Sequence, residues 1–342
     1  MSETWRLPDT LLPDGERRPL WVRDGLLTTA PIPQAAALPG RFALPGLVDA
    51  HAHVTLIDQE PAGALGGVRN LLEMRGQGVL LVRDVGSRAS ATLDIDPHPE
   101  LPTLIAAGRW HAPEGRFYPA FHVPVPEAAL VPSALTELAR GAKWVKVIAD
   151  WRTNELSYPA EALATLVRQV HAAGGRVAAH TQWPDVAEVV AAGVDSVEHG
   201  SFVDEATLRV MAERGVAWTP TLSAFNSRLP ADAPAHVVER RANWLANYRV
   251  MLPVADRLGV TILAGTDTVG TLADEIRQLV DYGLEPVAAI RAATTTARAF
   301  LRQPGLDDGA PADVVTFDED PREDPGALRR PAAVVLRGRR IS

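Results

Sequence analysis

The sequence lacks cysteine and has only two lysines among its 34 basic residues. The absence of cysteine excludes disulfide bonds and thiolate metal sites, so metal ligands would have to be histidine, aspartate, glutamate or modified lysine. Both lysines, Lys143 and Lys146, fall in the segment GAKWVKVIAD. Because the chain uses arginine everywhere else, a retained lysine indicates a position that needs an amine able to lose its proton or to react.

Long apolar runs and a surplus of positive charge are also missing. No segment offers the roughly 18 uninterrupted apolar residues of a membrane span, and MSETWRLPDTLLPDGERR has no basic n-region followed by an apolar stretch. The net charge of −8 and the pI near 5.6 argue against a nucleic-acid or anionic-membrane partner. We therefore expect a cytoplasmic protein that acts on a small-molecule substrate, and the sequence leaves a homo-oligomer open.

Short apolar runs alternate with longer stretches of helical period from residue 44 onward, which is typical of βα units in a parallel arrangement. Eight runs can be counted: Leu44–Ala50, Val79–Val85, Thr103–Ala107, Trp144–Ala149, Arg176–Ala179, Val194–Val197, Val216–Leu222 and Val260–Ala264. Eight such units predict an α/β fold, a closed (β/α)8 TIM barrel.

The segments between these runs carry helix signals. Pro159–Ala173 is followed by two glycines, and Asp204–Arg214 is closed by Gly215, as helix C-termini commonly are. Residues 94–131 are rich in proline and show little periodicity. We therefore expect the third strand to lead into a long loop, a common place for substrate contacts.

The two ends of the chain have a different character. Residues 1–43 and 305–342 contain short β-like pieces such as LWVRDG, ADVVTFD and AAVVLRGRRI. They predict a small β-sandwich domain built from both termini, flanking a barrel of residues 44–304. Extra edge strands would give the same pattern.

Polar residues follow or end several of the predicted strands. Taken singly, each has an ordinary structural explanation, such as a helix cap or a hydrogen-bonded core histidine. Because the carboxyl ends of barrel strands converge on one mouth, where active sites lie, five coincidences are a poor explanation. These residues are His51, His53, His180, His199 and Asp267, and Lys146 lies within the fourth strand.

Lys146 has a chemical reason to be there. Lys143 lies an odd number of residues away, so the two side chains face opposite sides of the strand and only one can enter the barrel. Burial of a lysine favours the neutral amine. A neutral amine can add carbon dioxide to form a carbamate, an anionic ligand able to bridge two metal ions.

Five motifs occur in a recognisable order: LPGLVDAHAH, WVKVI, AAH, VEHG and AGTD. Together they resemble the amidohydrolase superfamily. More narrowly, the chain is similar to its imidazolonepropionase-like and metal-dependent Xaa-Pro dipeptidase (prolidase) branch, with DSVEHGSFVDEATLRVMAERGVAWTPTL a particularly close match. The similarity covers residues 44–342 well and the first 43 residues weakly.

The resemblance implies a binuclear metal site. His51, His53 and Asp267 would hold one divalent ion, His180 and His199 the second, and carboxylated Lys146 and a hydroxide would bridge them. The hydroxide would attack the carbonyl, while Asp267 takes its proton and passes it to the leaving group. Zinc is the favoured metal, and manganese or cobalt also suits such ligands.

Two segments depart from the branch. The third-strand loop contains His111, Tyr118 and His122, which we take as candidate substrate contacts or ordinary loop residues. After His180, residues 181–183 replace a tyrosine that dipeptidase relatives often carry, which weakens the case for prolidase activity itself. We assign no role to His98, His171 and His236, and we expect the many arginines to solubilise helix faces.

The sequence favours a metal-dependent hydrolase that cleaves the C–N bond of a dipeptide, an N-acyl amino acid or a cyclic amide. Hydrolysis of an ester or lactone is chemically close. Two alternatives remain open: a mononuclear metal-dependent deaminase on the same barrel, which Lys146 disfavours, and a non-catalytic barrel that serves as a scaffold.

Overall fold

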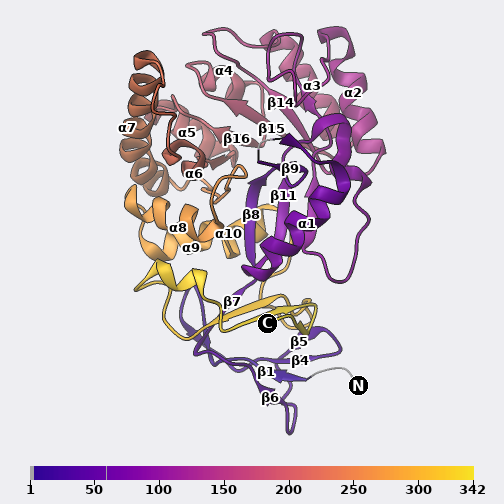
Figure 1. Ribbon diagram of the computed structural model, residues 1–342, viewed down its shortest axis with the longest axis vertical. Helices are drawn as coiled ribbons and strands as arrows, with labels where there is room; N and C mark the ends of the chain where they lie inside the picture. Colours follow the sequence, from indigo (N-terminus) through magenta and orange to yellow (C-terminus); the bar gives the residue numbers. More distant parts are fainter. Residues whose placement is uncertain (1–3, 59) are drawn as a thin grey trace.

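The computed structural model describes residues 4–58 and 60–342. The chain has an α/β fold in which a region of parallel strands and surrounding helices stands above sheets formed by the two ends of the chain (Figure 1). Within the described residues, no helix is long and apolar enough to cross a membrane.

The central strands form two parallel sheets, ordered β12-β11-β8 and β13-β14-β15-β16-β17. Their residues are buried on both faces, as expected for parallel strands covered by helices. The strands are β8 (Leu47–Ala52), β11 (Val79–Asp84), β12 (Thr103–Ala106), β13 (Trp110–His111), β14 (Trp144–Ile148), β15 (Arg176–Thr181), β16 (Ser196–His199) and β17 (Ala217–Thr219). A short hairpin, β9 (Leu56–Ile57) with β10 (Glu60–Pro61), follows β8.

Two predicted strands differ clearly from the observed ones. The run Leu44–Ala50 is split at Gly46 between two sheets. The third run forms β12 as predicted, and the separate short strand β13, which pairs with β14, follows it. The eighth run, Val260–Ala264, forms only an isolated bridge between Ile262 and Trp218. A main-chain hydrogen bond from the Ala50 amide to the Ala264 carbonyl, 2.9 Å long, nevertheless ties this segment to β8.

Helices follow most of the central strands. One of them, α5, shows both of its sequence signals: it begins after Asp204, whose side chain accepts from the Thr207 amide, and it ends at Gly215 in the left-handed conformation. The helices are α1 (Gly63–Gly76), α2 (Glu127–Ala139), α3 (Ala160–Ala172), α4 (Val186–Ala191), α5 (Glu205–Arg214), α6 (Leu222–Asn226), α7 (Ala235–Leu258), α8 (Leu272–Asp281), α9 (Pro286–Ala292) and α10 (Thr295–Phe300), with short 3-10 turns at Arg88–Asp94 and Pro325–Arg329.

The two ends of the chain meet in one six-stranded sheet of order β20-β19-β18-β7-β2-β3, beside a four-stranded sheet of order β5-β4-β1-β6. A separate apolar cluster, which includes Leu20, Val22 and Val335, draws on strands of both sheets. The arrangement of the two sheets as a sandwich and the domain limits at 43/44 and 304/305 stay predictions. The strands are β1 (Trp5–Arg6), β2 (Thr10–Leu11), β3 (Glu16–Arg17), β4 (Trp21–Arg23), β5 (Leu26–Thr28), β6 (Ala36–Ala37), β7 (Phe42–Pro45), β18 (Val314–Phe317), β19 (Ala333–Leu336) and β20 (Arg339–Arg340).

Gly265 allows the segment after the eighth run to approach β8 closely. A Cβ atom added there would lie 2.5 Å from the His51 Cβ and 2.8 Å from the Thr219 Cγ2. We expect Gly265→Ala to lower the free energy of unfolding by about 1–3 kcal/mol, because overpacking shifts the backbone. Urea denaturation measures this loss. Gly76→Ala is the control, since a Cβ there meets no atom within 4 Å; equal stability of both variants would contradict the close approach.

Candidate metal centre and its cavity

One cavity collects the predicted ligands. It has a volume of about 720 Å³ and opens where the central parallel strands end. All six predicted ligands line it: His51, His53, Lys146, His180, His199 and Asp267. The structure therefore brings together residues that are up to 216 positions apart in the sequence.

His51, His53 and Asp267 form the first part of the cluster. The Asp267 Oδ1 lies 3.2 Å from the His53 Nε2 and 3.4 Å from the His51 Nε2. His51 and His53 lie on and just after β8, and the Asp267 amide donates to the His51 carbonyl at 2.8 Å. The two histidines and the carboxylate thus lie close together because a main-chain hydrogen bond holds the segment after the eighth run against the end of β8.

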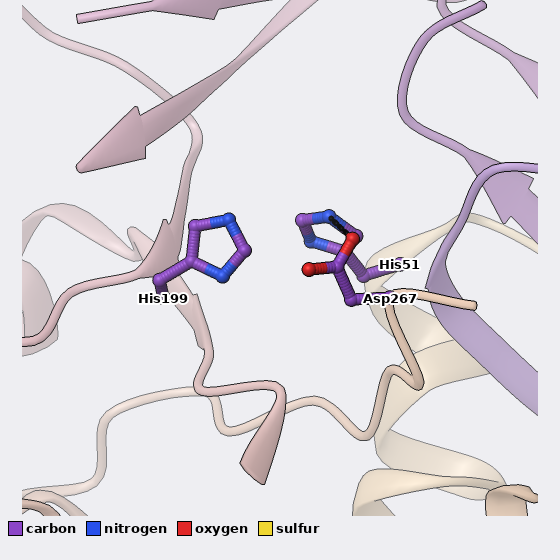
Figure 2. A group of neighbouring side chains, drawn as sticks. All are labelled: His51, His199 and Asp267. Atoms are coloured by element: carbon purple, nitrogen blue, oxygen red, sulfur yellow. Dashed lines mark ion pairs between the residues drawn. The ribbon is translucent and has the colours of Figure 1, made fainter. Parts of the chain in front are cut away.

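His180 and His199 form the second part. They end the neighbouring strands β15 and β16, and their ring centroids lie 4.6 Å apart. The His199 ring is also 5.0 Å from that of His51. One ligand atom from each of His51, His199 and Asp267 lies within 4.8 Å of the other two, and Figure 2 shows these side chains facing a common space. The two parts therefore adjoin.

Buried nitrogen atoms in the cluster have no hydrogen-bond partner within the described chain. They are the His51 Nε2, the His180 Nε2 and the Lys146 Nζ. Leaving such atoms unpaired costs about 1–3 kcal/mol each unless something else binds them. Imidazole nitrogens and a carboxylate are good ligands for divalent transition metals. These residues therefore fit a metal centre.

In three of the histidines the Nε2 faces the cluster and the Nδ1 makes a hydrogen bond that orients the ring. The His51 Nδ1 lies 2.6 Å from the Glu198 Oε2, the His53 Nδ1 2.9 Å from the Gly86 carbonyl, and the His199 Nδ1 2.8 Å from the Thr221 Oγ1. Metal-binding histidines characteristically donate their second N–H in this way, which fixes the tautomer and leaves the Nε2 for the metal.

The backbone is strained at the same place. His199 and Asp267 have φ angles of 66° and 52°, in the left-handed region that residues other than glycine seldom adopt. Such a conformation costs about 1–3 kcal/mol per residue and clusters at functional sites. The main-chain bond from Asp267 to His51 helps to hold one of these turns.

Burial and charge set the protonation of the cluster. Burial lowers the pKa of the Lys146 amine to about 8, so a larger fraction of it is neutral near physiological pH than of an ordinary lysine. Burial also lowers the pKa values of His180 and His199 well below their ordinary range. Although burial opposes ionisation of Asp267, the neighbouring His51 and His53 outweigh it and hold the pKa of the carboxyl well below the usual value. Contact with Asp267 in turn raises the pKa of His53 against the effect of burial. The cluster thus favours neutral imidazoles at His180 and His199 and an ionised carboxylate at Asp267.

Of the three predicted substrate contacts, only one lines the cavity. Tyr118 lines it and is 43% exposed. His111 and His122 are buried away from the lining: the His111 Nδ1 donates to the Lys146 carbonyl at 3.0 Å, and the His122 Nδ1 donates to the Tyr118 carbonyl at 3.0 Å. These contacts give both histidines a structural role in the wall, and their contact with substrate stays a prediction.

Several residues of the site were not identified from the sequence. Glu198 contacts His51 and pairs with the buried Arg83, and Asp49 accepts hydrogen bonds from Thr266 behind the cluster. His236 lines the cavity with Arg240, Arg241 and Trp244, so the expectation of solvated helix arginines is wrong here. Spacing offered a signal, because these α7 residues recur at intervals that place them on one helix face.

Comparison with known proteins agrees with this architecture. The profile of the amidohydrolase family matches residues 42–341. An uncharacterized protein of Mycobacterium tuberculosis is 36% identical over 346 aligned residues, covering 96% of this chain and 93% of that protein. Ochratoxinase of Aspergillus niger is 30% identical over 217 residues, which cover 58% of this chain and 45% of the ochratoxinase.

Solved structures share the fold. The crystal structure of A. niger ochratoxinase has a TM-score of 0.81 at 22% identity, covering all of this chain and 96% of that one. A Xaa-Pro dipeptidase with bound methionine has a TM-score of 0.82 at 21% identity, covering 99% of this chain and all of that one.

Glu198→Gln tests the contact that orients His51. The variant keeps the shape of the side chain but removes the charge that faces His51 and Arg83. Loss of such a contact typically weakens metal binding by about 10- to 100-fold, and competition of Zn²⁺ with a chromophoric chelator measures it. The exposed Glu213→Gln on α5 is the control. Equal Zn²⁺ affinity of folded Glu198→Gln and wild-type protein would show that this contact does not orient a ligand.

Proposed function

The chain belongs to the amidohydrolase family and is a hydrolase that acts on C–N bonds, and on this premise we propose that it uses a binuclear metal centre to cleave an amide of a small molecule. The observation that carries the proposal is the convergence of four histidines, Asp267 and the partnerless Lys146 amine on one cavity. Relatives named ochratoxinase and Xaa-Pro dipeptidase support a small amide or dipeptide as substrate. An ester or a lactone would be hydrolysed by the same attack on a carbonyl group and is the alternative substrate class.

We propose the same division of ligands that the resemblance implies. His51, His53 and Asp267 would hold one divalent ion, and His180 and His199 the other, with Zn²⁺ favoured. The Lys146 Nζ would form a bond to the carbon of carbon dioxide and release one proton, giving a carbamate shared by both ions. Its burial and the low pKa of its amine support this reaction, because the neutral amine is the nucleophile.

When bound, the ions would polarise the substrate carbonyl and lower the pKa of a water molecule. The chain's own residues complete the reaction. Asp267 accepts the proton of the attacking water on a carboxylate oxygen and transfers it to the leaving amine nitrogen. Glu198 keeps the His51 ring in place.

We also propose that the two central sheets form the wall of one closed (β/α)8 barrel. The bridge between Trp218 and Ile262 and the bond from Ala50 to Ala264 support closure on one side. The bridge between Ser87 and Arg109 and the bond from the Lys143 amide to the Ala106 carbonyl support it on the other. Parallel strands of such a barrel place their carboxyl ends, and hence the cluster, at one mouth.

Lys146→Arg tests the bridging ligand. Arginine keeps the positive charge of an uncarboxylated lysine but cannot form the carbamate, so we expect about half the metal content per chain and at least a 100-fold loss of kcat/KM, as expected for a group acting in the transition state. Metal analysis and a panel of dipeptides, N-acyl amino acids, cyclic amides and lactones measure both.

Lys143→Arg is the matched control, because Lys143 is exposed at the start of the same strand. A ¹³C resonance from labelled bicarbonate should appear in the wild-type and Lys143→Arg proteins but not in Lys146→Arg. A fully active Lys146→Arg variant with two ions would contradict the proposal, and one ion per wild-type chain would favour the mononuclear alternative.

Asp267→Asn tests the proton transfer. Asparagine can still coordinate a metal through its amide oxygen but is a far weaker base, so we expect kcat to fall by about 100-fold or more while the substrate KM changes little. Steady-state kinetics of metal-loaded protein measure this. Near wild-type turnover with full metal content would assign the proton transfer to another group.

A further inference from the structure

Aromatic side chains form much of the cavity wall around the candidate ligands. Aromatic residues make up 6% of the chain but eight of the 26 residues that line the cavity. The Phe117 ring lies 5.0 Å from that of Trp151 and 6.2 Å from that of His180. On another side, the Phe225 ring lies 5.7 Å from that of His199. These walls match a flat, apolar group on the ligand.

Arginines line the same cavity without carboxylate partners. Arg152, Arg240 and Arg241 form no ion pair with an acidic side chain among residues 4–58 and 60–342. The Arg240 Cζ lies 5.3 Å from the Trp244 ring centroid and 5.5 Å from that of Trp183, and its buried Nε has no hydrogen-bond partner in the described chain. The Arg241 Nη1 donates to the Ser227 carbonyl at 2.6 Å, which leaves its charge without an acidic partner. Guanidinium groups stay charged in proteins, so these cations can bind an anionic group of a ligand.

The position of Arg240 sets the distance between the two ends of a ligand. Trp244, which packs against Arg240, lies 5.5 Å from Phe225, and Phe225 in turn contacts His199. Arg240 is therefore separated from the ligand cluster by two aromatic rings. An anionic group held there would lie several ångströms from a scissile bond at the cluster, within one cavity large enough for a drug-sized molecule.

We propose that the substrates are amides that carry both an aromatic ring and a carboxylate, such as an N-aroyl amino acid, and that Arg240, assisted by Arg241, binds the carboxylate. This inference rests on the proposed amide hydrolysis and adds the substrate class. The guanidinium fork can bind both carboxylate oxygens, while the ring stacks on the aromatic walls. The net charge of the protein is −8, whereas Arg152, Arg240 and Arg241 make the cavity locally positive. Anions are therefore attracted to the cavity more than to the rest of the surface.

Kinetics of three compounds test the proposal on the Zn²⁺-loaded protein. They are N-benzoylglycine, its neutral carboxamide N-benzoylglycinamide and the ring-free N-acetylglycine, with release of benzoate or acetate as the readout. We expect kcat/KM for N-benzoylglycine to exceed both others by about 10- to 100-fold, the usual effect of one charged hydrogen-bonded contact. Arg240→Gln should remove the preference over the carboxamide, so that kcat/KM for N-benzoylglycine falls to about the value for N-benzoylglycinamide.

Arg257→Gln is the matched control, because Arg257 is exposed on the same helix and lies outside the cavity lining. It should keep the wild-type preference. Equal hydrolysis of the acid and the carboxamide by the wild type, or an Arg240→Gln variant that keeps the preference, would overturn the substrate class while leaving amide hydrolysis intact. Failure to hydrolyse any of the three compounds would count against the proposed function instead.

A binding assay separates the two proposals. Trp151, Trp183 and Trp244 line the cavity, so their fluorescence reports on a bound ligand. We expect 4-phenylbutyrate, which has no scissile amide, to bind Arg240→Gln about 10-fold more weakly than the wild-type and Arg257→Gln proteins, whereas neutral 4-phenylbutanol binds all three alike. Equal affinity of 4-phenylbutyrate for Arg240→Gln and wild type would overturn the carboxylate site whatever the activity.

Discussion

Glu198 lies on β16, fully buried, with its two oxygens bound to different partners. One oxygen faces the His51 Nδ1 and the other the Arg83 guanidinium, which stacks on Trp144. Removing a carboxylate from water is costly unless it is paired and hydrogen-bonded, and here both conditions are met. Because Glu198 immediately precedes His199, its contacts position both the strand that carries this candidate ligand and the ring of a second candidate, His51.

The sequence contained enough to predict the members of the cluster but not the contacts that orient them. His51, His180 and His199 follow apolar runs, and the carboxyl ends of parallel strands meet, so convergence followed from the pattern. Glu198 looked like an ordinary strand residue because its partners, His51 and Arg83, are 147 and 115 positions away. Such pairings depend on register and twist, which no local pattern encodes.

The errors have physical causes of the same kind. The eighth run is apolar enough for a strand, yet it forms one isolated bridge to Trp218 and a main-chain bond with Ala50 in place of a continuous ladder. Arg240 and Arg241 resemble solvated helix residues until α7 is placed against the cavity, after which the same face carries the unpaired cations. Helix propensity and amphipathic spacing locate a helix; only its packing shows which polar residues face a ligand.

The number of bound ions can be read from a crystal structure of the zinc-loaded protein, with anomalous scattering recorded at the zinc edge. We expect two anomalous peaks, one beside His51, His53 and Asp267 and one beside His180 and His199. Electron density should continue from the Lys146 Nζ into a carbamate between them. A single peak among His51, His199 and Asp267, with a free Lys146 amine, would rule out the binuclear centre.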